Sequence, residues 1–340
     1  RAALRRARAR LGARGRGASS ERKVLNTPSD TLHSLPQHTP LAHLWRVSET
    51  PPPDSTTQDS STRDSIGAQV LSLRAFGTLL VEPAEAVSPD EAARSRWHAE
   101  VLELSRRRRK VALLVYLHGS TRPVSRDLLM ELLWPDDEPE RARHSLNEAL
   151  SHLRRVLGRD ALGARGGDVK LATDVPLVSD VHRFDDAVRR GRAVDAIGLY
   201  AGPFLDGVFI DRAPRFELWV ANERERLRQA LVSACQAVCA TECTVYTAPQ
   251  QAVAARKWLE ASPGSEDAAR AWITALTVAG TPDALRAGLA AYEQIVREVR
   301  VEDDEPLAPS LQQLGARLRE RVVETEAVAR ETLVETALAG

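Results

Sequence analysis

The chain has 340 residues, of which 43% are hydrophobic, and its 47 basic and 47 acidic residues give a formal net charge of zero. This length favours about two globular domains, and the neutral total argues against a wholly basic protein that coats nucleic acid. No apolar run is long enough to cross a membrane, and the opening RAALRRARARLGARGRG lacks the apolar centre of a signal peptide. We therefore expect a globular, cytoplasmic protein.

The three cysteines cannot form a closed disulfide framework, which also favours a reducing compartment. Cys235, Cys239 and Cys243 are spaced to line one face of a helix, where they could bind a metal or react with an oxidant. No fourth thiol and no nearby histidine accompanies them. Packing of small side chains against a neighbouring helix is the simpler interpretation, and we favour it.

Residues 1–66 combine an arginine-rich start with segments rich in proline, serine and threonine, which predicts a disordered tail. From Val70 onward, apolar and polar residues alternate with period two in VLSLRAFG and in TLLVE. Gly77 separates these two segments, and together they predict two antiparallel strands. A polar insertion at 83–97 follows. AEVLEL at 99–104 alternates again and predicts one more strand, and RRRRKVALLVYLHG predicts a helix that ends at Gly119.

The next segment predicts a short helix that begins after the N-cap residue Ser125 and ends before Pro135. A longer helix over 140–157 follows, and then DALGARGGDVKLATD predicts a hairpin with its turn at Gly166 and Gly167. Strands, helix, short helix, longer helix and hairpin, in that order, form a winged helix-turn-helix. In such a fold the longer helix lies in the DNA major groove.

The helix at 140–157 has two different faces. Its core face is predicted to consist of Ala142, Leu146, Ala149, Leu150, Leu153 and Leu157. Nearly opposite lie His144, Glu148, Ser151 and Arg155, with Asn147 and other polar side chains beside them. A solvated helix face is the ordinary explanation of such a stripe, but donors and acceptors at this density also suit the reading of a polar partner.

From Val181 to the end, the sequence predicts antiparallel helices, several with the spacing of helical-hairpin repeats. The predicted fold class is mainly α with a small antiparallel β part. The predicted parts are a disordered tail at 1–66, a winged-helix DNA-binding domain at 67–178, a TPR-like domain at 179–323 and a helical tail at 324–340. Core packing, rather than a ligand cage, is expected for Trp134, Trp219, Trp258 and Trp272.

The stretch RPVSRDLLMELLWPDDEPERARHSLNEALSHLRRVLG resembles the second and third helices of SARP-type activators, the Streptomyces antibiotic regulatory protein family. VSDVHRFDDAV, LYAGPFLDGVF, WVANERERLRQ and AYEQIVREVRVEDDEPLAPSLQQL resemble, in the family's order, its bacterial transcriptional activator domain. The resemblance covers about residues 70–320. It implies an OmpR/PhoB-type winged helix, an activator function, a homodimer on DNA and contact with RNA polymerase. The insertion at 83–97 and both ends of the chain depart from the family pattern.

Under this interpretation, double-stranded DNA is the partner, and two sets of contacts are expected. The residues expected to reach base edges are His144, Asn147, Glu148, Ser151, His152, Arg154 and Arg155. Those expected to hold phosphates are Arg108, Arg109, Lys110, Ser125, Arg126, Arg141, Arg143, Arg165 and Lys170. The basic run at 106–110 stands at a predicted helix start, where either a phosphate or simple solvation would offset the unfavourable helix dipole.

An enzyme is the less favoured interpretation, because the sequence has no GxSxG, HExxH, glycine-rich nucleotide loop or Cys-x-x-Cys motif. No lysine follows a glycine, so the nucleoside-triphosphatase loop of larger family members is missing. We expect no catalytic site, no metal and no cofactor. The alternative function is a helical-repeat scaffold whose winged helix serves protein contacts only.

Overall fold

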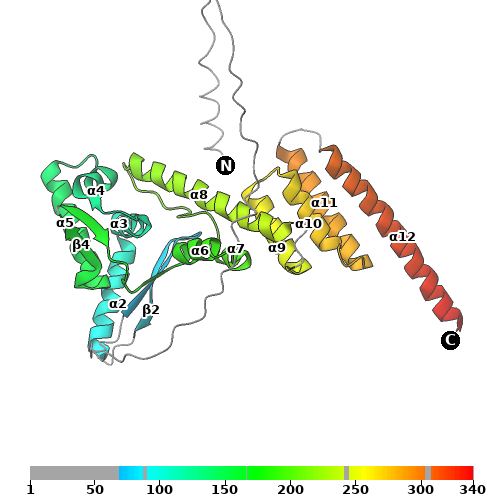
Figure 1. Ribbon diagram of the computed structural model, residues 1–340, viewed down its shortest axis with the longest axis horizontal. Coiled ribbons are helices and arrows are strands. Elements are labelled where there is room, and N and C mark those ends of the chain that lie inside the picture. Colours follow the sequence, from blue (N-terminus) through cyan, green and yellow to red (C-terminus); the bar gives the residue numbers. More distant parts are fainter. Residues whose placement is uncertain (1–68, 87–89, 166, 241–244, 303–307, 340) are drawn as a thin grey trace, which may run out of the picture. The chain divides into compact units, whose positions relative to one another are not determined.

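The computed structural model describes residues 69–86, 90–165, 167–240, 245–302 and 308–339 (Figure 1). The predicted disordered tail at 1–66 lies outside these residues. The described part is mainly helical and contains two small three-stranded sheets. A winged helix-turn-helix followed by helical pairs confirms the predicted fold class. Among the described helices, none is both long and apolar enough to cross a membrane.

The first sheet contains the predicted hairpin and one additional strand. Strands β1 (Gln69–Arg74) and β2 (Leu80–Ala86) are antiparallel, as expected. Strand β6 (Leu177–Ser179), which the sequence analysis did not predict, pairs in parallel with β1, so the strand order is β2-β1-β6. Leu71 and Leu73 of β1 are buried in the core beneath this sheet.

The strand predicted at 99–104 is wrong, because this segment belongs to helix α2 (Glu91–Arg106). The Asp90 carboxylate accepts hydrogen bonds from the backbone N–H groups of Ala92 and Ala93 and caps the helix. Trp97, Val101 and Leu104 are the buried residues of α2. Their spacing follows the helical period, which overrides the short alternation of AEVLEL.

The helix-turn-helix agrees with the sequence prediction. Helix α3 (Arg108–Gly119) is followed by β3 (Val124–Ser125), α4 (Arg126–Leu133) and the long helix α5 (Pro139–Leu157). The Ser125 hydroxyl accepts a hydrogen bond of 3.2 Å from the backbone N–H of Leu128, as expected of an N-cap.

The predicted hairpin follows α5 after a short 3-10 helix, η1 (Arg159–Ala161). Strands β4 (Leu162–Arg165) and β5 (Asp168–Leu171) are antiparallel, and β5 also pairs with β3, so the second sheet has the order β3-β5-β4. These three strands form the wing. Val169 and Leu171 of β5 are buried and fix the wing to the helices.

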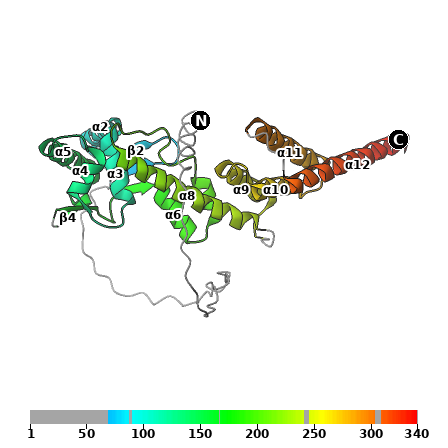
Figure 2. The same ribbon diagram turned by 90° about the horizontal axis from the view of Figure 1, so that it is seen from above.

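The remaining elements are helices that pack in chain order. They are α6 (Asp180–Arg189), α7 (Ala193–Leu199), α8 (Pro214–Cys239), α9 (Ala248–Ala261), α10 (Glu266–Thr277), α11 (Pro282–Glu302) and α12 (Pro309–Ala339). From α8 to α12, each helix contacts the next (Figures 1 and 2). This arrangement is that of helical-hairpin repeats. Helix α12 continues without a break through the position where a separate tail was expected to begin.

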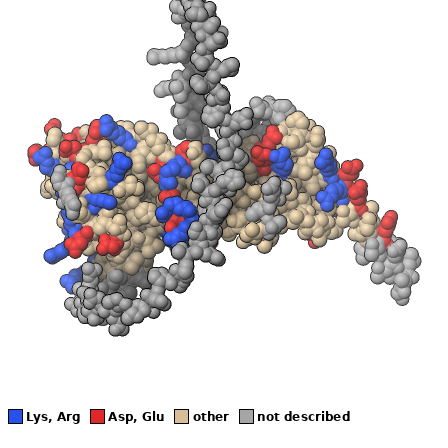
Figure 3. Space-filling view, in the orientation of Figure 1, with Lys and Arg blue, Asp and Glu red and all other residues tan. Residues whose placement is uncertain are grey.

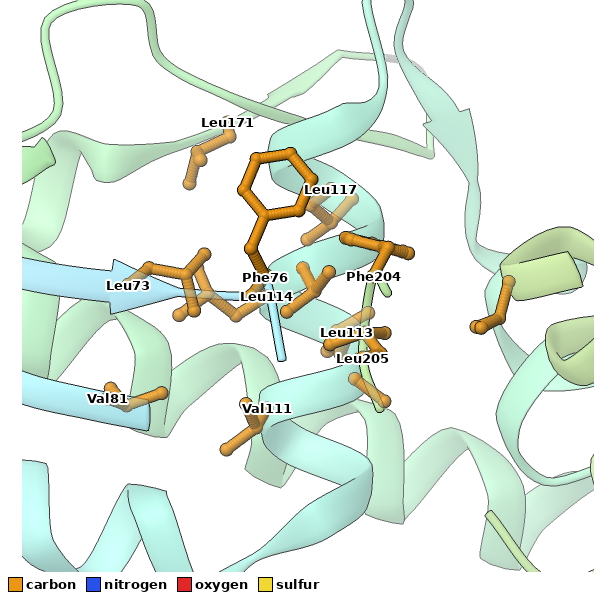
Figure 4. Close-up of a cluster of buried hydrophobic side chains, with 14 of the residues drawn as sticks. Leu73, Phe76, Val81, Val111, Leu113, Leu114, Leu117, Leu171, Phe204 and Leu205 are labelled. Atoms are coloured by element: carbon orange, nitrogen blue, oxygen red, sulfur yellow. The ribbon is translucent and has the colours of Figure 1, made fainter. Parts of the chain in front are cut away.

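One hydrophobic core joins the winged helix to the first helices that follow it. Figure 4 shows Leu113, Leu114 and Leu117 of α3 in a cluster with Phe76 and Phe204. The Asp180 carboxylate at the start of α6 accepts 2.9 Å hydrogen bonds from the backbone N–H groups of Ala75 and Phe76. The two parts therefore share both apolar packing and a polar clamp.

The tryptophan and cysteine side chains pack as the sequence analysis favoured. Trp134, Trp258 and Trp272 are buried, and Trp219 packs against aromatic neighbours that include Phe216. Cys235 is buried and Cys239 is half-buried; burial raises the pKa of their thiols to about 12 and about 11. Both side chains pack with the hydrophobic core, as small apolar cysteine side chains do. Cys243 lies outside the described residues.

Candidate nucleic-acid interface

Helix α5 is anchored by the face that the sequence predicted. Ala142, Leu146, Ala149, Leu150, Leu153 and Leu157 are all buried, and Val156 joins them. Pro139 occupies the first turn, where its missing N–H costs no hydrogen bond. At the other end, Gly158 has a φ of 103°, which a side chain would disfavour. The helix is thus held in one rotation about its axis, which decides which polar residues face outward.

Most of the polar stripe on α5 is open. His144, Asn147, Glu148, Ser151 and Arg155 are exposed, and Arg154 is half-exposed. Within the described part of the chain, His144, Ser151 and Arg154 have no hydrogen-bond or ion-pair partner for their side chains. These three groups are free to accept or donate to a molecule that docks on the stripe.

Asn147 is held in one orientation by the preceding helix. The Arg126 guanidinium on α4 donates a 2.7 Å hydrogen bond to the Asn147 Oδ1. The amide NH₂ group of Asn147 has no hydrogen-bond acceptor among the described residues. Since Oδ1 has a second lone pair, the amide keeps both a free donor and a free acceptor while Arg126 positions it.

His152 does not belong to the open face, and the predicted base contact by His152 is wrong. Its side chain is 1% exposed because α2 packs over this side of α5. The Lys110 ammonium lies 3.4 Å from Nδ1, so Nδ1 accepts and the opposite nitrogen, Nε2, donates to the Glu100 carbonyl oxygen at 3.1 Å. Burial is the largest effect on the pKa of His152 and lowers it, which favours this neutral ring.

Lys110 is also engaged within the protein. Its ammonium donates a 2.8 Å hydrogen bond to Glu148, and only 14% of its side chain is exposed. This hydrogen bond is the main reason that the pKa of Glu148 is lowered. A phosphate contact by Lys110 does not fit this geometry, because the ammonium is mostly covered and already paired.

Arg155, at the far end of the stripe, is paired with Glu100 of α2 at 3.2 Å. The same carboxylate oxygen lies 3.2 Å from the His152 Nε2. Glu100 therefore contacts one open and one buried residue of α5. The sequence analysis missed this residue because Glu100 lay in the segment that was predicted to be a strand.

The other residues expected to hold phosphates surround α5 unevenly. Arg141 is exposed and has no ion pair with a described residue, whereas Arg143 pairs with Glu140 at 2.7 Å. On α3, Arg108 is exposed and the Arg109 guanidinium donates to the Asp211 carbonyl oxygen at 3.1 Å. Two residues of the wing complete the set. The side chain of Arg165 lies outside the described residues, and Lys170 lines a cavity behind the wing.

The basic run at 106–110 is divided between two helices. Arg106 ends α2, Arg107 is the residue between them, and α3 begins at Arg108 without a side-chain cap. Arg107 pairs with Glu103 at 2.8 Å. In the part of the surface that Figure 3 shows for the winged helix, basic and acidic side chains alternate. On this face, a docking polyanion would therefore meet separate positive charges rather than a continuous basic field.

A comparison with protein families gives a match in the helical part of the chain. Residues 179–319 match the family model of the bacterial transcriptional activator domain. This match confirms the resemblance of that part of the chain to the bacterial transcriptional activator domain.

No curated protein matches the sequence. Among solved structures, the chain is similar to Mycobacterium tuberculosis EmbR in complex with a low affinity phosphopeptide. The sequence identity is 19%, the match covers 79% of this chain and 71% of that chain, and the TM-score is 0.44.

Proposed function

We propose that the chain is a sequence-specific, DNA-binding transcriptional activator that reads the major groove with helix α5. The observation that carries this proposal is the open polar stripe on a helix whose opposite face is fixed in the core. An α-helix fits the major groove, where each base pair presents its own pattern of donors and acceptors. The activator domain at 179–319 supports the regulatory role.

Asn147 is the strongest candidate for a base contact. An asparagine amide can bind adenine by accepting from its N6 amino group and donating to N7. The contact with Arg126 leaves both of these possibilities open, and it reduces the conformational freedom lost on binding. His144, Ser151 and Arg154 would contact neighbouring bases. Arg155 and Glu148 would join them by exchanging their internal partners for guanine and cytosine.

The phosphate contacts would position α5 without specifying sequence. We assign them to Arg108, Arg109, Ser125, Arg126, Arg141, Arg143 and Arg165. Lys110 and Lys170 are omitted because one is covered and paired and the other lines a cavity. By analogy with the family, the helical domain would hold a second copy of the chain and RNA polymerase at the promoter.

The test is a selection of DNA sites from a random pool with the purified full chain, followed by the same selection with Asn147→Ala. We expect relaxed preference at one base position, with a loss of about 1–3 kcal/mol on the preferred site. Asn222→Ala is the matched control, because Asn222 is an exposed asparagine on α8. A uniform loss on all sequences would count against base reading. Selection of no sequence at all would favour the scaffold function instead.

A further inference from the structure

A cavity of about 710 Å³ lies behind the wing, and none of the residues assigned to DNA lines it. Its walls come from the end of α3, the segment from β5 to β6, and helices α6 and α8. No residue of α5 lines it. Pockets for small organic molecules commonly have volumes of about 300–1,000 Å³, so the space is large enough for one.

The walls combine an apolar part with polar and charged side chains. The lining includes Leu73, Leu117, Leu171, Phe204 and Trp219. Figure 4 shows the first four of these in the cluster around α3. Trp219 is half-buried and presents an aromatic surface from α8. An apolar, ring-containing molecule would gain by leaving water for this environment.

The charges of the cavity are mostly neutralised from within. Arg226 binds the Asp185 carboxylate through two hydrogen bonds of 3.0 and 3.1 Å and also binds Glu223 at 2.9 Å. Lys170 is different, because no described residue forms an ion pair with it. The cavity therefore has one lining cation that is available to an anion, beside two carboxylates that would repel a highly charged polyphosphate.

A pair of histidines supplies a further polar group. The rings of His118 and His182 stack with their centroids 3.6 Å apart, and the His182 Nε2 lies 3.0 Å from the His118 carbonyl oxygen. The His118 Nε2 is buried and has no hydrogen-bond partner in the described part of the chain. Buried polar atoms without a partner are uncommon in native proteins. Both histidines line the cavity.

From these contacts we infer that the cavity binds a small amphipathic organic anion, with its apolar body against Leu117 and Trp219 and its single negative group at Lys170. The bound molecule would touch the wing and α8 at the same time. The lining of this site shares no residue with the proposed contacts with DNA.

The experiment is a fluorescence titration of the full chain with 8-anilinonaphthalene-1-sulfonate, an aromatic probe with one sulfonate group. We expect saturable binding at one site. Ala172→Trp should abolish this binding by filling the cavity, since Ala172 lines it and is half-buried. Lys170→Met should weaken binding about tenfold, the effect of one charge-assisted contact. Arg159→Met removes the same charge from an exposed residue outside the cavity and should leave binding unchanged.

Undiminished binding to Ala172→Trp would overturn the inference, because the probe would then bind elsewhere, for example near the exposed Phe209 and Leu218. Absence of saturable binding to the unmodified chain would overturn it as well. Equal affinity of Lys170→Met would overturn the assignment of the anion. Thermal melting verifies that each variant is folded, and Thr173→Trp, at an exposed lining residue, replaces Ala172→Trp if that variant is unfolded.

Discussion

His144 and His152 stand two turns apart on the same helix and have opposite environments. His144 is exposed and has no hydrogen-bond partner among the described residues, whereas His152 is buried beneath α2 and linked to Lys110 and Glu100. The difference shows that a polar stripe on a helix can serve two purposes. One part is available to a partner, and the other part fixes the helix to its neighbours.

Replacement of the two histidines should separate these purposes most strongly. His152→Ala removes two hydrogen bonds and leaves a buried space, so we expect the free energy of unfolding to fall by about 2–4 kcal/mol. His144→Ala should change it by less than about 0.5 kcal/mol, as is usual for an exposed residue. Urea denaturation followed by circular dichroism measures both. Similar losses for the two variants would contradict the comparison.

The two arginines at the ends of the stripe should differ in DNA binding. Arg141 has no ion pair with a described residue to break, so Arg141→Ala should weaken binding to all DNA sequences. The plot of log K against log salt should also become less steep, by about one unit. Arg155→Ala should have a smaller effect, because Arg155 must first leave Glu100. Fluorescence anisotropy over a series of salt concentrations gives both slopes. A larger effect from Arg155→Ala would reverse our assignment.

Glu100→Gln should strengthen DNA binding, whereas the two arginine substitutions should weaken it. Loss of the carboxylate frees Arg155 for DNA, and we expect binding to become tighter by about twofold to fivefold, the range of a partly exposed ion pair. Glu103→Gln is the matched control, since Glu103 lies on the same helix but pairs with Arg107. The two variants can be compared by anisotropy on one DNA duplex. Weaker binding by Glu100→Gln would show that Glu100 positions Arg155 rather than competing for it.

The smallest expected effect is on the pH dependence of stability. Because burial lowers the pKa of His152, the unfolded chain takes up a proton at this residue as pH falls below about 6.5, while the folded chain resists it. The contribution of His152 to the free energy of unfolding is therefore retained above that pH and lost as the pH falls below it. His152→Gln removes this contribution, so its melting temperature should fall less than that of the unmodified chain between pH 7 and pH 5. Identical slopes would argue that His152 is protonated in the folded state.

The sequence predicted the helix-turn-helix well because each element carries its own signals. Ser125 caps α4, Pro135 follows it, and the apolar residues of α5 repeat with the helical period. The wing was found because two alternating segments flank a pair of glycines. These signals are local, so no knowledge of the tertiary structure was needed.

The errors of the sequence analysis share one cause, which is that each depends on contacts between residues distant in sequence. AEVLEL is short enough to satisfy a strand pattern, and the prediction of a strand there left out the helix that covers His152. The burial of His152 depends on a neighbour distant in sequence, so the angular position on α5 could not reveal it. Strand β6 escaped notice for a similar reason: its three residues form a strand only because β1 lies beside them.

The clamp formed by Asp180 has a practical consequence for dissecting the protein. A fragment that stops at residue 178 would delete the carboxylate that accepts from Ala75 and Phe76, and it would strip the aromatic ring of Phe184 from the shared core. Expressed alone, such a fragment should be prone to aggregation, because truncation exposes part of the shared core. Aggregation of this fragment would then be a result of the truncation and not a property of the native fold. Fragments designed to retain α6 and α8 would keep both the shared core and the hydrogen bonds of Asp180.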